Sequence, residues 1–162
     1  MTRLSARGLS LSYRPQHGTV RAVDRVSFDI AADEIFGVVG ESGCGKSTLA
    51  DSIPGLIDGN GEISGGDLTY EGRSLTDLSE RDLANTVRGK QISMVFQDPN
   101  SSLDPVYTIG EQLIETIRKH LDLSKTDARE RAIELLDDVG IPSPAERLDD
   151  YPHQFSGGMK QR

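Results

Sequence analysis

The sequence contains a single cysteine, Cys44, and no tryptophan among its 162 residues. One cysteine excludes an internal disulfide and a cysteine-based zinc site, and it fits a reducing compartment. The longest apolar stretch, residues 35–39, is far shorter than the roughly 20 residues that a membrane-spanning helix needs, and no charged-then-apolar leader opens the chain. We therefore expect a cytosolic protein that does not itself cross a membrane.

Basic residues are fewer than acidic residues. Lys and Arg number 18 against 26 Asp and Glu, which gives a formal net charge of −8. A surface that binds nucleic acid usually clusters Lys and Arg to neutralise phosphates, so this balance argues against a nucleic-acid partner. With 35% hydrophobic and 27% charged residues, the composition is typical of a soluble globular domain.

Apolar patterning predicts a mixed α/β chain. Period-two alternation predicts strands over residues 4–13 and 26–30, while the compact apolar runs at residues 35–39 and 91–96 predict strands buried on both faces, as in a parallel sheet. Residue Asp33 suits a left-handed turn, and residues 63–70 fit a hairpin.

Helices are predicted elsewhere. Residues 46–53 can form one until Pro54 and Gly55 end it, and Ser79 is a candidate cap for another. A Ser124–Asp127 capping box precedes the second of two amphipathic helices. The apolar positions that should face the core of these two helices are Ile109, Leu113, Ile114, Ile117 and Leu121 on one, and Ala128, Ala132, Leu135, Leu136 and Val139 on the other.

One motif carries a phosphate-binding mechanism. It follows the apolar run at 35–39, opens the helix predicted at 46–53 and matches G-x-x-x-x-G-K-[ST] in full. Its residues are Gly40, Glu41, Ser42, Gly43, Cys44, Gly45, Lys46, Ser47 and Thr48. Glycines let backbone N–H groups curl around a phosphate, and the helix N-terminus adds partial positive charge.

The side chains of this P-loop suit a nucleoside triphosphate with magnesium. Lys46 is a mobile positive charge for the β- and γ-phosphates, Ser47 offers a hydroxyl to Mg²⁺, and Thr48 orders the neighbouring phosphate. Cys44 occupies a free position of the motif, where we interpret it as a spacer rather than a redox switch. A P-loop alone leaves kinases, GTPases, motors and transporters open.

Two further motifs narrow this choice: V-F-Q-D-P at residues 95–99 and F-S-G-G-M-K-Q-R at residues 155–162. With the P-loop, in this order and spacing, the sequence resembles the nucleotide-binding subunit of an ABC transporter over essentially the whole chain. The resemblance implies an α/β fold: a P-loop NTPase core with an incomplete, mostly parallel sheet, an antiparallel β portion and an α-helical subdomain. It implies that residues 1–97 belong to the core and about 98–162 to the helical subdomain.

The same resemblance assigns roles to residues outside the P-loop. Gln97 would contribute to the Mg²⁺ and water environment, and Tyr13 would stack on adenine. Ser156, Gly157 and Gly158 form the signature, which would serve the ATP bound on a second subunit packed head to tail. Expected cofactors are ATP and Mg²⁺, and the catalytic assignments are Lys46 and Gln97.

Strings such as QDPNSSLDPVYTIGEQL (residues 97–113) and YPHQFSGGMKQR (residues 151–162) look most like the importers for peptides, dipeptides and nickel. That subgroup implies two transmembrane permease subunits, a paired ATPase subunit in a homodimer or heterodimer, and indirectly an extracytoplasmic substrate-binding protein. The protein would then lie peripherally on the cytoplasmic face of the membrane.

The family's second Mg²⁺-linked aspartate, catalytic glutamate and switch histidine would come after residue 162, so we expect this chain to be the N-terminal part of a longer ATPase. Alone, it should bind nucleotide weakly and hydrolyse almost none. Glu41 and Glu111 lack the strand-end context of a general base. The alternatives left open are a soluble ABC-type ATPase acting on DNA or translation, and a non-catalytic nucleotide-binding module.

Overall fold

The computed structural model describes residues 2–16, 18–96 and 102–162. These form two units, Met1–Ser93 and Met94–Arg162, each with its own hydrophobic core. Among the described residues, no helix has both the length and the apolar character to cross a bilayer.

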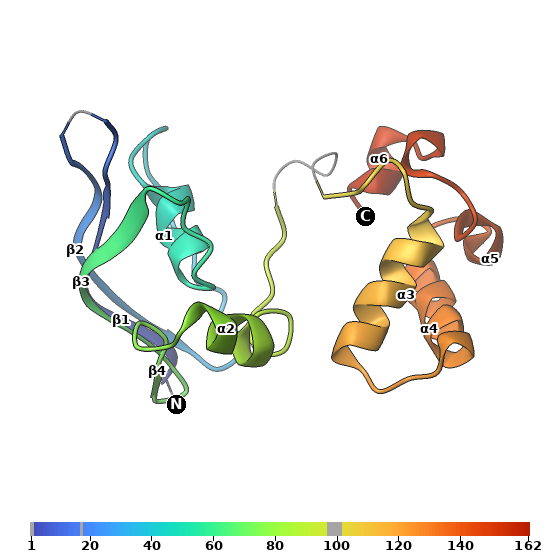
Figure 1. Cartoon of the computed structure of the whole chain (residues 1–162), viewed down its shortest axis with the longest axis horizontal. Helices are drawn as coiled ribbons and strands as arrows, with labels where there is room; N and C mark the ends of the chain where they lie inside the picture. The colour runs from blue at the N-terminus through green and yellow to red at the C-terminus, as the bar shows by residue number, and fades with distance from the viewer. Residues whose placement is uncertain (1, 17, 97–101) are drawn as a thin grey trace. The chain divides into compact units, whose positions relative to one another are not determined.

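The first unit is built on an antiparallel sheet with the order β2-β1-β3-β4 (Figure 1). Strand β1 (Thr2–Tyr13) pairs on one side with β2 (Val20–Ala31) and on the other with β3 (Gly61–Tyr70), which turns back into the short β4 (Arg73–Ser74). The strands predicted at residues 4–13 and 26–30 are confirmed, and so is the turn at Asp33, whose φ is 62°.

A bulge in β1 explains its hydrophobic pattern. The buried apolar side chains of β1 fall on even positions at Leu4 and Ala6 and on odd positions at Leu9 and Leu11, with a register shift between Ala6 and Leu9. An extra residue in one strand moves every later side chain to the other face, so the change of parity keeps the leucines in the core. Gly8 lies at this bulge with φ of 57°.

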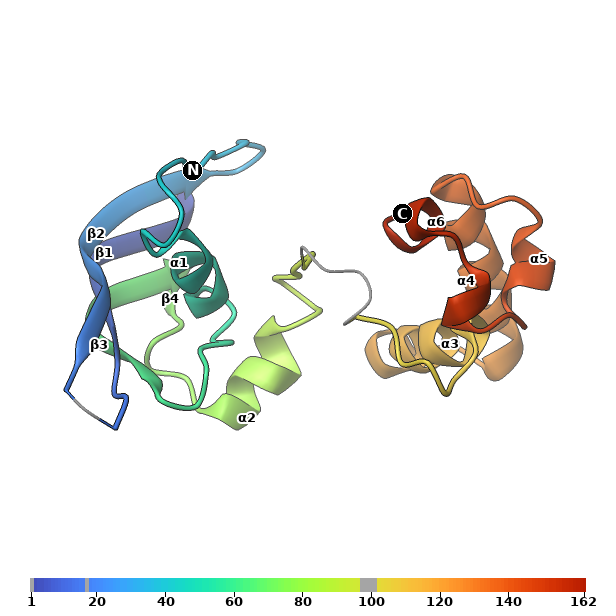
Figure 2. The same cartoon turned by 90° about the horizontal axis from the view of Figure 1, so that it is seen from above.

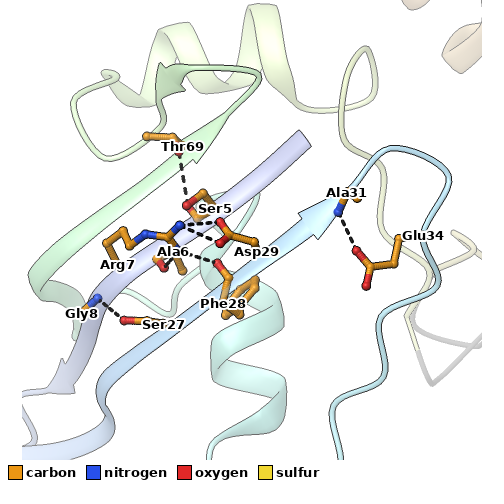
Figure 3. A network of polar contacts seen from close by, with 10 residues as sticks. All are labelled: Ser5, Ala6, Arg7, Gly8, Ser27, Phe28, Asp29, Ala31, Glu34 and Thr69. Carbon is orange, nitrogen blue, oxygen red and sulfur yellow. Dashed lines mark hydrogen bonds and ion pairs between the residues drawn. The ribbon is translucent and has the colours of Figure 1, made fainter. Parts of the chain in front are cut away.

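The outer face of the sheet carries a polar network (Figure 3). The guanidinium of Arg7 donates to both carboxylate oxygens of Asp29 at 2.7 Å and to the main-chain oxygen of Phe28 at 3.2 Å. Hydrogen bonds from Arg7, and then from Ser5, hold the pKa of Asp29 below its ordinary value. Because this pair is exposed, it ties β1 to β2 without contributing much to stability.

The inner face of the sheet packs against α1 (Lys46–Ser52) and the π-helical turn η1 (Leu83–Val87), which contribute buried side chains to the core. Helix α2 (Glu80–Asp82), none of whose residues is buried, leads directly into η1 (Figure 2). The cap predicted at Ser79 is confirmed, since its hydroxyl accepts a hydrogen bond from the Asp82 amide. The buried core consists of Leu4, Ala6, Leu9, Leu11, Val23, Leu49, Leu68, Leu75, Leu83 and Val87.

Two strand predictions are wrong. Residues 35–39 and 91–96 form no strand, and the side chains of Ile35, Val39 and Val95 are 100%, 93% and 97% exposed. Ile92 makes only an isolated parallel bridge to Arg88. A strand buried on both faces needs hydrogen-bonded neighbours, and the described residues supply strands only to the antiparallel sheet.

The second unit is helical. Helices α3 (Ile109–His120) and α4 (Lys125–Asp138) lie side by side, followed by α5 (Pro144–Arg147), the 3₁₀ turn η2 (Pro152–Gln154) and α6 (Gly157–Lys160) (Figure 1). The cap at Ser124 is confirmed by its bond from the Asp127 amide. The buried residues are Ile109, Ile117, Ala128, Ala132, Leu136, Ile141, Leu148 and Phe155.

The predicted apolar faces of α3 and α4 are right except at their C-terminal ends. Leu121 and Val139 are 50% and 42% exposed, because each follows the last helical residue, where the chain turns away from the packed face. A close approach not foreseen from the sequence joins α3 to α5: a Cβ on Gly110 would lie 2.7 Å from the Leu148 carbonyl oxygen.

Candidate functional site

The P-loop lies where the sequence predicts it, in the turn that leads into α1. Gly45 is the N-cap of the helix, with φ of 95°, and Lys46 is the first helical residue. Gly43 has φ of 81°. Both glycines therefore adopt a backbone conformation that side chains with a Cβ rarely take, which explains their place in the motif.

Close contacts give a second reason for glycine at positions 40 and 45. A Cβ on Gly45 would lie 2.3 Å from the main-chain oxygen of Ala22, so the loop rests directly on the backbone of β2. A Cβ on Gly40 would lie 2.7 Å from the sulfur of Cys44. The thiol of Cys44, itself exposed, thus fills the inside of the turn.

Lys46 folds back over its own loop. Its Nζ donates to the main-chain oxygens of Gly40 at 2.9 Å and Glu41 at 2.6 Å, and it lies 3.7 Å from the sulfur of Cys44. The chain between Gly40 and Lys46 is thereby closed into a ring around an ammonium group. A phosphate oxygen entering this ring would exchange a neutral carbonyl partner for a charged one, which makes a stronger hydrogen bond.

The helix end beside the loop favours an anion. The N-cap makes no side-chain hydrogen bond, and the first turn of α1 carries no acidic residue, so no negative side chain competes for the helix end. A hollow of about 180 Å³ lies there, lined by Ala22, Gly43, Gly45, Lys46, Ser47 and Thr48. The hydroxyl of Ser47 is exposed at this hollow. Ser42 and Gly43 form the turn at its rim.

Tyr13 ends β1 in the same unit, as expected, and is half-buried. Its ring packs so closely against Gly61 that a Cβ there would lie 2.7 Å from its Cε1. This packing holds one edge of the Tyr13 ring in place. The stacking of Tyr13 on adenine stays a prediction.

The signature residues open α6 in the second unit. Ser156 is the N-cap and accepts a hydrogen bond from the Met159 amide at 3.3 Å. A Cβ on Gly157 or Gly158 would meet open space, so neither glycine is required by local packing. Phe155, only 7% exposed, anchors the segment to the core of this unit. The main chain at Gly157 and Gly158 is therefore exposed, while the buried side chain of Phe155 holds the segment on the core of this unit.

Several other expectations concern metal and acid–base groups. Gln97 lies outside the described residues. In the described part of the chain, no group of three or more His, Cys, Asp or Glu side chains could hold a metal ion. Ser47 provides the hydroxyl that suits Mg²⁺ in a P-loop. Glu111 completes a capping box with Thr108 at the start of α3, which accounts for it without a catalytic role.

Arg88 is a residue of the same unit that the sequence did not single out. Its guanidinium contacts the chain that follows α1 and the carboxylate of Glu80. No local pattern could have revealed this, because the partners are up to 34 residues away in the sequence.

The fold and the loop place the chain among P-loop nucleotide-binding proteins. The sequence model of the family described as ABC transporter matches residues 23–162. The protein therefore belongs to the ABC transporter family, and the α/β fold class expected from the sequence is confirmed.

Individual relatives agree with this assignment. The chain is 46% identical to the dipeptide transport ATP-binding protein DppD of Escherichia coli (strain K12), over 100% of this chain and 49% of the relative. It is 45% identical to the oligopeptide transport ATP-binding protein OppD of Salmonella typhimurium, over 98% of this chain and 47% of the relative. The chain thus spans about half the length of the curated relatives that it matches.

Solved structures give the same fold. A dimeric bacterial ABC transporter cassette is 27% identical, with a TM-score of 0.81, over 98% of this chain and 65% of the cassette chain. A post-hydrolysis dimer of an ATP-binding cassette bound to ADP and Pi is 24% identical with a TM-score of 0.80, over the same shares of both chains.

Proposed function

We propose that this chain provides the ATP-binding loop of a subunit that couples ATP hydrolysis to peptide import. The observation that carries the proposal is the P-loop itself: Gly45 and Lys46 open α1 beside a hollow that no acidic side chain of the first helical turn enters. The names of the 44–47% identical relatives, dipeptide and oligopeptide transport ATP-binding proteins, give the substrate class.

The roles within the site follow from chemistry. Lys46 neutralises the β- and γ-phosphates, the backbone N–H groups of residues 43–48 surround the β-phosphate, and Ser47 is a ligand to Mg²⁺. The metal, when bound, neutralises charge that develops on the transferred phosphoryl group. Gln97 completes the metal and water environment, and Tyr13 stacks on the adenine ring.

The signature acts on a second nucleotide. Ser156, Gly157 and Gly158 are exposed and meet the γ-phosphate held by a paired ATPase subunit, head to tail. The subunit works with two transmembrane permease subunits and, through them, an extracytoplasmic substrate-binding protein. It lies on the cytoplasmic face of the membrane, and nucleic acid is not a partner.

Titration calorimetry with MgATP tests the nucleotide site. The wild-type chain should bind, although weakly, whereas Lys46→Ala should lose binding. Lys90→Ala, which removes an exposed lysine from the same unit, is the matched control and should bind as wild type does. No heat from the wild-type protein would refute the proposal.

The importer assignment needs a separate experiment on the complete transport system. The full-length subunit should co-purify with two multi-span membrane proteins, and Lys46→Ala in it should stop uptake of a radiolabelled dipeptide. Turnover stimulated by DNA or RNA, without such membrane partners, would instead identify a soluble ABC-type ATPase.

A further inference from the structure

Arg88 forms hydrogen bonds with two main-chain carbonyl groups and one carboxylate. Its Nε donates to the carbonyl oxygen of Pro54 at 2.7 Å, and its Nη2 donates to the carbonyl oxygen of Gly55 at 2.7 Å. The carboxylate of Glu80 accepts from both Nη1 and Nη2, the latter at 3.0 Å. The side chain is only 22% exposed, against 73% for that of Glu80.

The two carbonyls lie just beyond the end of the P-loop helix. Residues Pro54 and Gly55 directly follow Ile53, the C-cap of α1. The guanidinium of Arg88 donates to each of these carbonyls and so ties the segment after α1 to the end of η1. The planar fork of arginine reaches several acceptors at once, which a lysine ammonium cannot do in the same geometry.

The contact depends on a glycine. Gly55 has φ of 71°, and a Cβ there would lie 2.9 Å from Cδ1 of Leu83 and 3.2 Å from Nη2 of Arg88. The end of α1 and the turn η1 are thus packed against each other with no space for a side chain between them. Leu83 and Val87 of η1 are buried, at 9% and 0% exposure, so η1 is a firm support.

Helix α1 is also held by apolar packing. Its buried residues are Leu49 and Ser52, and the hydroxyl of Ser52 donates to the carbonyl oxygen of Leu49 within the same helix. Leu49 and the half-buried Ile53 pack on the core of the first unit, and Arg88 adds directed hydrogen bonds to the chain that follows the helix. The helix is seven residues long, or roughly 10 Å, so a shift at its C-terminus reaches the P-loop.

We propose that Arg88 is a positioning residue of the nucleotide site, which fixes α1 along its axis by holding the carbonyls of Pro54 and Gly55 on η1. This inference rests on the proposed function, because it concerns the helix whose N-terminus faces the phosphates. Glu80 orients the guanidinium from its free side, and Arg88 in turn lowers the pKa of Glu80 by hydrogen bonding.

The test compares MgATP affinity with the free energy of unfolding in the full chain. Arg88→Ala should weaken MgATP binding by roughly tenfold or more at a temperature where the variant is fully folded. Arg88→Lys, which keeps the charge, should lose less, and Glu80→Gln, which keeps the carbonyl contacts, should lose least. Amide exchange at Ser47 and Thr48 should accelerate in Arg88→Ala.

Two controls separate positioning from stability. Leu68→Ala removes a side chain that is 1% exposed in the sheet core, so it should lower the unfolding free energy without changing affinity in the folded state. Arg3→Ala removes an exposed ion pair with Glu71, at 51% and 52% side-chain exposure, and should change neither quantity much. If Arg88→Ala does not fold, Arg88→Lys and Glu80→Gln carry the test.

The possible outcomes separate failure of the Arg88 inference from failure of the proposed function. Wild-type affinity in Arg88→Ala, with Lys46→Ala failing to bind, overturns the inference and leaves the proposed function intact. The same loss of affinity in Leu68→Ala also overturns it, since Arg88 would then act only through stability. Absence of binding by the wild-type chain overturns both.

Discussion

The ammonium of Lys46 donates to the main-chain oxygen of Glu41 at 2.6 Å, five residues earlier in the chain. This bond closes the P-loop on itself and holds the lysine at the centre of the turn. The shape of the loop is therefore set by its own backbone and by the glycines that allow it to curl. A triphosphate that binds here would meet a loop already closed by its own hydrogen bonds, and such preorganisation reduces the entropy lost on binding.

Gly45→Ala should destabilise the protein and remove nucleotide binding. The new Cβ would be forced into a φ of 95° and would lie 2.3 Å from the Ala22 oxygen, at a cost of roughly 1–3 kcal/mol from backbone strain alone, before the clash. Urea unfolding measures this. Gly72→Ala, at φ of 80° with nothing within 4 Å, is the matched control and should cost less. Equal losses in the two variants would contradict the role assigned to the Ala22 contact.

Alkylation of Cys44 by N-ethylmaleimide should weaken MgATP binding. The thiol is exposed, fills the inside of the turn beside Gly40 and lies 3.7 Å from the ammonium of Lys46, so a bulky adduct crowds the loop. Calorimetry before and after complete modification, verified by mass spectrometry, measures the change. Cys44→Ser should bind nucleotide and resist the reagent. Unchanged affinity in fully modified protein would refute this prediction.

The Arg7–Asp29 pair should make stability depend on acid pH. The pKa of Asp29 is lowered in the folded protein, so the pair stabilises the fold above the ordinary value of 3.8 and loses this effect as pH falls through the lower folded value. Urea midpoints at about pH 7 and pH 3 measure the loss. Arg7→Gln should reduce the difference between the two midpoints, and Asp29→Asn should reduce it at least as much, because the hydrogen bond from Ser5 also lowers the pKa of Asp29. A difference unchanged in both variants would rule out the pair as its source.

Gln112→Ala should loosen the segment before α3. The amide group of Gln112 accepts from the Asp104 amide at 2.9 Å and donates to the main-chain oxygens of Asp104 and Tyr107, each at 3.0 Å. Losing these bonds should cost about 1 kcal/mol and speed hydrogen exchange at the Asp104 amide. Thr116→Ala removes a hydroxyl that donates to the Gln112 carbonyl and should leave that exchange unchanged. Slow exchange at Asp104 in Gln112→Ala would mean that other contacts hold the segment.

Local patterns predicted the features that depend on neighbouring residues. The period-two strand at residues 4–13, the cap at Ser79, the cap at Ser124 and the loop-to-helix transition at Lys46 each depend on interactions within a few residues. The predicted domain boundary near residue 97 and the roles of Gln97 and Tyr13 stay predictions.

The sequence by itself determined the phosphate loop and the helix caps, because the conformations of Gly43 and Gly45 and the bonds of Lys46 arise within nine consecutive residues. Only the tertiary structure decided that residues 35–39 and 91–96 would stay unpaired, since a strand forms only where another strand meets its hydrogen-bonding groups. It also decided that Arg88 would hold the end of α1, because that contact joins residues more than thirty positions apart, which only folding brings together.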